Sequence, residues 1–210
     1  MGRYNKGILG AFSGSVGPVV GINYRGADVL RSKPKTSAKP PTAKQLAQRE
    51  KFAFAMQFLN PAKELLNTYY GLPDGTKSRY NMAVSYHLTE ALFYADKIFE
   101  IAFDKVMYAK GTLLPAENLQ ASRVTDNTLL LTWTDNSQQA DCKPNDQLMV
   151  VAYEPESKSY AFFMKAATRA AAETVLQLPA SWNGKLVHLY GFMAAENGKS
   201  NSSSLYLGTV

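Results

Sequence analysis

Hydrophobic and polar positions change their spacing several times along the chain, and the first pattern is a β-hairpin near the start. The runs VVGINY and ADVLRS are short and β-like, and they lie on either side of Arg25-Gly26. Residues 7–17 before them are rich in Gly and Ser, which indicates unusual backbone angles or close approach to another backbone. Because two strands alone bury too little surface to be stable, we expect them to pair or pack elsewhere, on this chain or on a neighbour.

A cationic connector and then a helical pattern follow the hairpin. The stretch RSKPKTSAKPP, residues 31–41, contains three prolines and favours extended chain. Thr42 and Gln45 have the spacing of a capping box, which predicts that a helix begins there. The apolar positions continue to Pro61, which ends or kinks the helix, and then to Gly71, a predicted C-cap. A second helix is predicted over SRYNMAVSYHLTEALF.

The pattern then changes to period two, which is typical of strands. Phe99, Ile101 and Phe103 alternate with Glu100, Ala102 and Asp104, so we predict a strand that continues through this run.

From residue 116 onward every element has the pattern of a short strand between polar turns. In NTLLLTWTDN the residues Leu129, Leu131 and Trp133 fall on one face, and DQLMVVAYEPESKSYAFFM predicts a hairpin. Strands at this spacing favour a β-sandwich. The predicted fold class is therefore α+β. Its segments are a β-arm with a Pro-rich tether (1–41), a two-helix segment ending in a strand (42–110) and a β-sandwich (111–210).

Positive charge is concentrated at the start of the chain. Residues 1–51 hold ten Lys/Arg and two Asp/Glu, whereas residues 52–110 are balanced and residues 111–210 have a net charge of −2. Such polarity indicates an anionic partner for the first segment, and nucleic acid, an acidic protein surface and anionic lipid all qualify. A solvated basic tether without a partner is the alternative.

Several kinds of chemistry lack support in the sequence. One cysteine, Cys142, excludes an intramolecular disulfide framework, and two histidines, His87 and His188, make a metal cluster improbable. No phosphate-cradling glycine motif and no Gly-x-Ser-x-Gly motif is present. We therefore predict no enzyme, no catalytic or metal-binding residue, no cofactor and no small-molecule substrate. Four carboxylates are expected to be solvated turn residues: Asp135, Asp141, Asp146 and Glu154.

Membrane insertion and export are not expected either. No run of eighteen apolar residues occurs, and the Gly-rich start lacks the leucine-rich centre of a signal peptide. We expect synthesis in the bacterial cytoplasm, with incorporation into a virion or another large assembly.

Two resemblances extend these expectations. The segments LLLTWTDN, LQLP and LVHLYGFMAAENGKSNSS resemble the strands and turns of a fibronectin type III module, over residues 115–210. The segments GAFSGSVGPVVGINYRGADVLRSKP and PTAKQLAQREKFAFA resemble a family of uncharacterised proteins found in phages and in bacterial genomes that carry mobile elements. The second resemblance implies no known activity, cofactor or catalytic residue, and it favours a structural or assembly protein.

The function predicted from the sequence is therefore non-enzymatic. We expect the N-terminal strands to add edge to edge onto protein neighbours, in a homo- or hetero-oligomer, with the tether along an acidic groove. The first alternative is non-specific binding of nucleic acid by the basic segment. The second is a surface adhesin or carbohydrate-binding module that uses Trp182 and Tyr160. The residues predicted to bind a partner are Val19, Val20, Ile22, Tyr24 and Val29 for strand pairing, and Arg25, Arg31, Lys33 and Lys35 for charge contacts.

Overall fold

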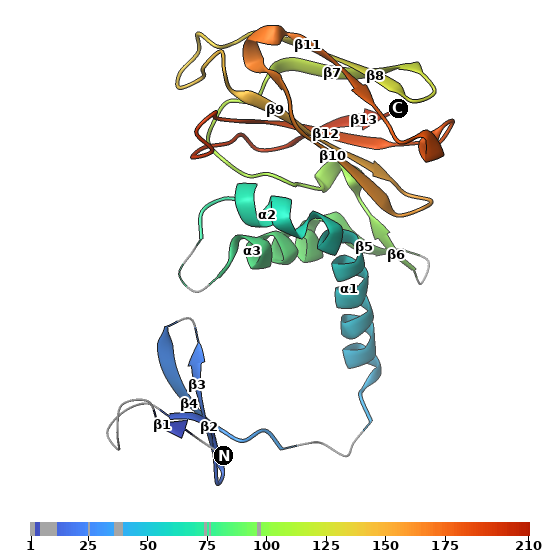
Figure 1. Ribbon diagram of the computed structural model, residues 1–210. Helices are drawn as coiled ribbons and strands as arrows, with labels where there is room; N and C mark the ends of the chain where they lie inside the picture. Colours follow the sequence, from blue (N-terminus) through green and yellow to red (C-terminus); the bar gives the residue numbers. More distant parts are fainter. Residues whose placement is uncertain are drawn as a thin grey trace. The chain divides into compact units, whose positions relative to one another are not determined.

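A computed structural model describes residues 3–4, 12–24, 26–35, 40–73, 75, 77–95 and 98–210. The chain divides into two compact units, which we call the arm (Met1–Leu46) and the body (Ala47–Val210). Helices and antiparallel strands are both present, and the strands form several sheets (Figure 1). The predicted α+β class is confirmed at this level.

The arm holds a four-stranded antiparallel sheet in the order β1-β2-β3-β4. Its strands are β1 (Arg3–Tyr4), β2 (Phe12–Val16), β3 (Val19–Tyr24) and β4 (Ala27–Ser32). The pairing of β3 with β4 runs without a shift from Val19↔Ser32 to Tyr24↔Ala27, which confirms the predicted hairpin. Gly17 and Gly26 have φ angles of +56° and +85°, a conformation that two-residue hairpin loops require and that glycine adopts without strain.

The helical region begins where the sequence predicts. The Thr42 N–H donates to Gln45 Oε1 (3.0 Å), and the Gln45 N–H donates to Thr42 Oγ1 (3.4 Å), so the capping box is confirmed. Helix α1 (Ala43–Leu59) ends just before Pro61, which lies in a single 3₁₀ turn.

Two more helices and a small hairpin complete this part of the chain. Helix α2 (Lys63–Tyr69) is followed by Gly71, whose φ of +62° fits its predicted place at the helix end. The other elements are α3 (Arg79–Tyr86), a π-helical turn (His87–Ala91) and the paired strands β5 (Leu92–Ala95) and β6 (Ile98–Ile101). The strand predicted to continue through Phe103 stops at Ile101, because Phe103 belongs to a 3₁₀ turn.

The remaining strands form two sheets, of four and three strands, in the orders β10-β9-β12-β13 and β11-β8-β7. Their bounds are β7 (Glu117–Thr125), β8 (Thr128–Thr134), β9 (Gln147–Glu154), β10 (Ser159–Thr168), β11 (Glu173–Gln177), β12 (His188–Ala194) and β13 (Leu205–Thr209).

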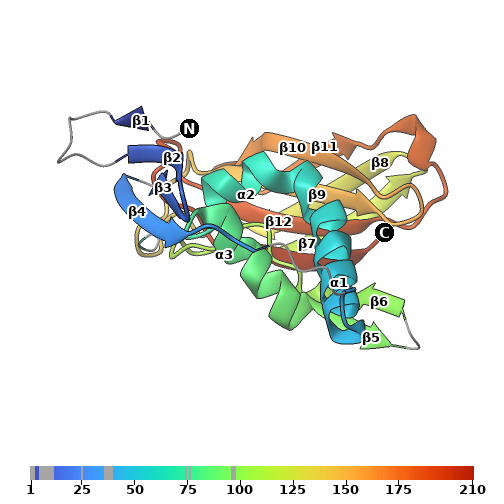
Figure 2. The same cartoon turned by 90° about the horizontal axis from the view of Figure 1, so that it is seen from below.

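The body has three layers, and its middle layer is the four-stranded sheet (Figure 1). One face of β9 and β12 carries Met149, Val151, Tyr190 and Phe192, which pack against α2, α3 and the end of α1. The other face packs against the three-stranded sheet through residues that include Leu148, Val150, Leu189 and Met193. Viewed from below, the helices lie across the four-stranded sheet (Figure 2). Residues 47–110 and 111–210 therefore share one core.

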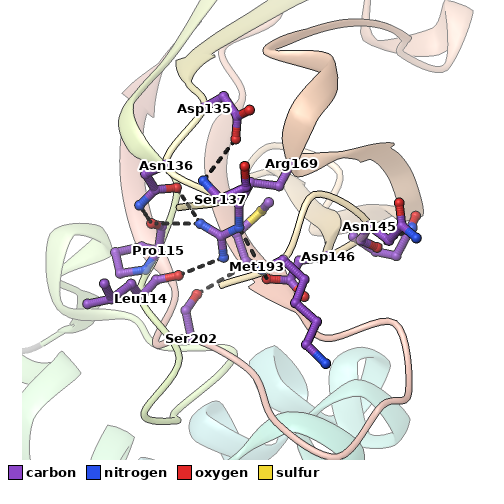
Figure 3. Close-up of polar contacts among 12 residues, drawn as sticks. Leu114, Pro115, Asp135, Asn136, Ser137, Asn145, Asp146, Arg169, Met193 and Ser202 are labelled. Carbon is purple, nitrogen blue, oxygen red and sulfur yellow. Dashed lines mark hydrogen bonds and ion pairs between the residues drawn. The ribbon is translucent and has the colours of Figure 1, made fainter. Parts of the chain in front are cut away.

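A buried arginine ties the loops at one end of this sandwich together (Figure 3). Arg169 is 0% exposed, and its Nε donates to Asp146 Oδ2 at 3.2 Å. Its terminal nitrogens donate to the carbonyls of Leu114 (2.9 Å) and Pro115 (3.3 Å) and to Asn136 Oδ1. The guanidinium thus joins the segment before β7 to the two ends of the loop between β8 and β9.

Replacing Arg169 with Met should destabilise the body strongly. The substitution leaves the Asp146 carboxylate buried without its cation, a change that costs about 3–5 kcal/mol in comparable pairs. We expect a lower midpoint in urea unfolding followed by tryptophan fluorescence. Arg169→Lys should have an intermediate effect, because it keeps the charge but loses the forked donors to the two carbonyls. A loss below about 1 kcal/mol for Arg169→Met would contradict a clamping role.

A second buried group makes the stability of the body depend on pH. His87 is 1% exposed, with Nδ1 at 2.7 Å from the Ala83 carbonyl oxygen and Nε2 accepting from the Met107 N–H at 3.2 Å. This pairing fixes the neutral tautomer with its proton on Nδ1. Burial lowers the pKa of His87 to about 4, although the hydrogen bond to Ala83 acts in the opposite direction.

Because the pKa of His87 is lower in the folded than in the unfolded state, acid should unfold the protein through this residue. The unfolded chain binds the proton first, so the contribution of His87 is complete above about pH 6.5 and is lost as the pH falls toward 4. The loss between about pH 7.5 and pH 5 should be about 2 kcal/mol. Urea unfolding of the wild type and of His87→Gln at several pH values measures it. A constant difference between the two proteins would show that His87 does not titrate in this way.

Candidate functional site

The described residues of the arm form a sheet but no hydrophobic core of their own. Among its described residues, only Gly21 is buried. Every residue of β4 is exposed, and Leu30 and Tyr24 are 65% and 51% exposed. A sheet of this size normally needs one face packed against other elements, so its apolar side chains form a candidate surface for a partner.

The register of β3 and β4 shows how the predicted partner-binding residues are distributed over the two faces. Ile22 pairs with Val29, and Val20 pairs with Arg31, so these four side chains share one face. Tyr24 has the same parity as Ile22 and lies on this face also. Val19 lies on the opposite face, the face that also carries Leu30.

The outer edge of β4 is open within the described residues, since the sheet order ends at this strand. The Lys33 N–H donates to the Pro18 carbonyl at 2.7 Å, which fixes the residues of β4 that bond inward to β3. Because inward and outward positions alternate in an antiparallel ladder, Asp28, Leu30 and Ser32 direct their N–H and C=O groups outward.

Two edge strands of the body, β10 and β7, have interrupted ladders, whereas the edge strand β11 pairs with β8 without a shift, as β4 does with β3. The ladder of β10 shifts between Phe163 and Ala167, around Lys165 with a φ of +57°. The ladder of β7 shifts twice, and Asn118 within it has a φ of +53°. Bulges of this kind hinder the addition of a further strand. The regular ladder of β4, six residue pairs long, therefore makes it a better template for strand addition than β7 or β10.

Three basic residues of the arm lie in the last part of β4 and in the segment just after it. Arg31, Lys33 and Lys35 are exposed, and they form no ion pair with any other described residue. Asp28 accepts a hydrogen bond from the Asn23 amide at 2.8 Å. The predicted contact residue Arg25 lies outside the described residues.

Other residues singled out in the sequence have structural roles. Cys142 is buried, although its surroundings in the sequence are polar. The expectation of solvated turn carboxylates is wrong for Asp146 and Glu154, which are both buried. Burial alone would raise the pKa of Glu154, but hydrogen bonds from Ser157 and Glu156, together with Lys185, hold it below its usual value.

The aromatic pair proposed for carbohydrate binding is not an exposed platform. Trp182 is 3% exposed and donates its Nε1–H to Ser159 Oγ at 3.0 Å. Tyr160 is half-buried and donates its hydroxyl to the Phe58 carbonyl at 2.8 Å. Both rings therefore contribute to packing.

The described residues lack a metal-ligand cluster and a membrane-spanning helix. They contain no group of three or more His, Cys, Asp or Glu side chains that could hold a metal ion. None of the helices they form has both the length and the apolar character needed to cross a membrane.

Comparison with known proteins assigns the chain to a family. A family model described as a family of unknown function (DUF6266) matches residues 11–208. The chain belongs to this family. The match begins in the arm and continues into β13, so both units are parts of the family's architecture. No curated protein matches the sequence.

Leu30 was not among the residues predicted to bind a partner, and it offers a direct test of the β4 edge. Leu30→Pro removes an outward N–H and leaves the inward bonds to β3 in place, so it should abolish strand addition. Leu30→Thr keeps the N–H and removes apolar area, so it should weaken association only slightly. Sedimentation velocity of both variants measures the effect. Equal losses in both would show that the side chain, rather than the strand edge, makes the contact.

Proposed function

We propose that this chain is a non-enzymatic structural or assembly protein that binds neighbouring protein subunits through its arm. In this proposal β4 adds edge to edge onto a strand of a neighbour, and the face with Val20, Ile22, Tyr24 and Val29 packs against it. The assembly is a virion or a phage-derived particle.

The observation that carries the proposal is the absence of a buried side chain among the described residues of the arm. Burial of apolar surface stabilises by about 25 cal/mol per Å², and it must offset the entropy lost when the strands become ordered. A sheet in which no described side chain is fully buried lacks most of this term. A neighbour that covers the apolar side chains of the sheet supplies the missing stabilisation.

The basic residues give the contact its orientation. Arg31, Lys33 and Lys35 follow one another at alternate positions and have no carboxylate partner among the described residues. An acidic groove on the neighbour would attract them and align β4 with the receiving edge.

The body is the part that the assembly displays, and we propose that its strands β7–β13 are a fibronectin type III-like sandwich. Seven antiparallel strands in sheets of three and four support this assignment. The helices cover the outer face of the four-stranded sheet, so the loops and the three-stranded sheet would be the parts open to further contacts.

Arg31, Lys33 and Lys35, which have no ion-pair partner among the described residues, also favour a second candidate function. This candidate is a protein that binds nucleic acid without sequence preference. Contacts to phosphates would then take the place of the acidic groove. Salt separates the two candidates, because the affinity for nucleic acid falls steeply with ionic strength.

The full chain should be an oligomer in solution, well above the 23.1 kDa of one chain. Deletion of residues 1–41 keeps the capping box of α1 and should give a monomer whose circular dichroism and cooperative unfolding resemble those of the intact body. Multi-angle light scattering of both proteins measures the mass.

The deletion has two informative alternatives. An oligomer that persists without residues 1–41 would overturn the assignment of the contact to the arm. A monomeric full chain that binds a duplex in a gel shift, with loss of binding between about 50 and 200 mM salt, would favour the nucleic-acid candidate.

A further inference from the structure

Three segments that are distant in the sequence meet at one end of the body and enclose a pocket of about 360 Å³. The first segment comprises the end of α2, the turn after it and the first residue of α3, the second is the linker that leads to β7, and the third is the loop between β12 and β13. The lining residues are Thr68, Gly71, Leu72, Arg79, Lys110, Gly111, Thr112, Gly198, Lys199, Ser200 and Asn201.

Main-chain hydrogen bonds hold these segments in place. The Lys110 N–H donates to the Tyr69 carbonyl (3.0 Å), and the Gly71 N–H donates to the Lys110 carbonyl (2.7 Å). The Leu113 N–H donates to the Asn201 carbonyl (3.1 Å), and the Asn201 side-chain amide donates to the Tyr69 carbonyl (2.9 Å). The frame of the pocket is therefore independent of the side chains of its lysines.

A glycine allows the linker and the loop to approach this closely. A Cβ atom at Gly111 would lie 1.9 Å from the carbonyl oxygen of Asn201, so no other residue fits without a shift of the backbone. This approach brings Lys110 and Lys199 to the same pocket although they are far apart in the sequence.

The charge of the lining has one sign. Three cations, Arg79, Lys110 and Lys199, line the pocket, and no described lining residue is a carboxylate. None of the three forms an ion pair with another described residue. One terminal nitrogen of Arg79 donates to the carbonyl of Thr68, at the end of α2, and its other N–H groups have no acceptor among the described residues.

Like charges gathered in a hollow repel one another and concentrate a positive potential, which an anion relieves. Lysine and arginine together with hydroxyl donors, here Thr112 and Ser200, are the groups that bind phosphate in proteins. We propose that this pocket binds a phosphate group, carried either by a small phosphorylated compound or by the backbone of a nucleic acid. The site lies entirely in the body and does not depend on the function proposed for the arm.

Calorimetric titration of the full chain with inorganic phosphate, at constant ionic strength set with chloride, tests the proposal. We expect saturable binding, and a loss of affinity of at least about tenfold in the double variant Lys110→Gln/Lys199→Gln, which removes two of the three cations. The matched control is Lys105→Gln, which removes an exposed lysine that lies outside this pocket and should bind phosphate like the wild type.

A short single-stranded oligonucleotide then identifies the source of the phosphate. Competition between the oligonucleotide and inorganic phosphate in the wild type, with loss of that competition in the double variant, would assign the pocket to a nucleic-acid backbone. Binding of phosphate without such competition would assign it to a small compound. Equal phosphate binding by the wild type and the double variant, or no saturation, would overturn the proposal, provided that circular dichroism shows both proteins folded.

Discussion

The burial of β9 and β12 on both faces is the constraint on which the body depends. Every residue of β12 is buried, and so is every residue of β9 except the first. A strand with two apolar faces must be covered twice, here by the helices on one side and by the three-stranded sheet on the other. The helices are therefore a layer of the same unit as the sandwich. The segment between β6 and β7 connects the helical layer to the three-stranded sheet.

The body covers both faces of its middle sheet with its own residues, whereas no described element covers the sheet of the arm in this way. The two sheet faces that need cover in the middle layer are covered by residues of the body. The sheet of the arm has its own ladder but no second layer among the described residues. Bulges interrupt the edge strands β7 and β10 of the body, whereas β4 in the arm and β11 in the body have regular ladders.

Local signals in the sequence predicted several elements correctly, but the helix predicted over residues 78–93 ends before β5, which begins at Leu92, and the strand predicted through Phe103 ends at Ile101. The capping box of Thr42 and Gln45, the break at Pro61 and the hairpin before the tether depend on neighbouring residues, so they could be predicted. The role of Asp146 could not, since it depends on Arg169, which lies 23 residues later and reaches the same end of the sandwich only in the fold. The continuous apolar runs of β9 and β12 did carry a signal of double burial, because a strand with one wet face alternates.

The two candidate binding sites, the sheet of the arm and the pocket in the body, could also be predicted only in part from the sequence. The apolar residues of the arm and its basic character are visible in the sequence, but the assignment of Val19 to the face opposite Val20 and Ile22 needs the register. The pocket with Lys110 and Lys199 is formed by segments that no local pattern connects.

The distribution of cations argues that the exposed clusters are not a by-product of composition. Residues 47–210 hold fifteen Lys/Arg and sixteen Asp/Glu, so the body contains at least as many carboxylates as cations. Where a cation serves the fold, as Arg169 does, it is buried and meets a carboxylate and three oxygen acceptors besides. Arg79, Lys110 and Lys199 instead line one pocket without a carboxylate among the described residues, at an electrostatic cost to the folded chain. Repulsion between such unpaired cations is removed when an anion binds, and proteins keep unfavourable groupings of this kind at functional sites. The same reasoning applies to Arg31, Lys33 and Lys35 in the arm.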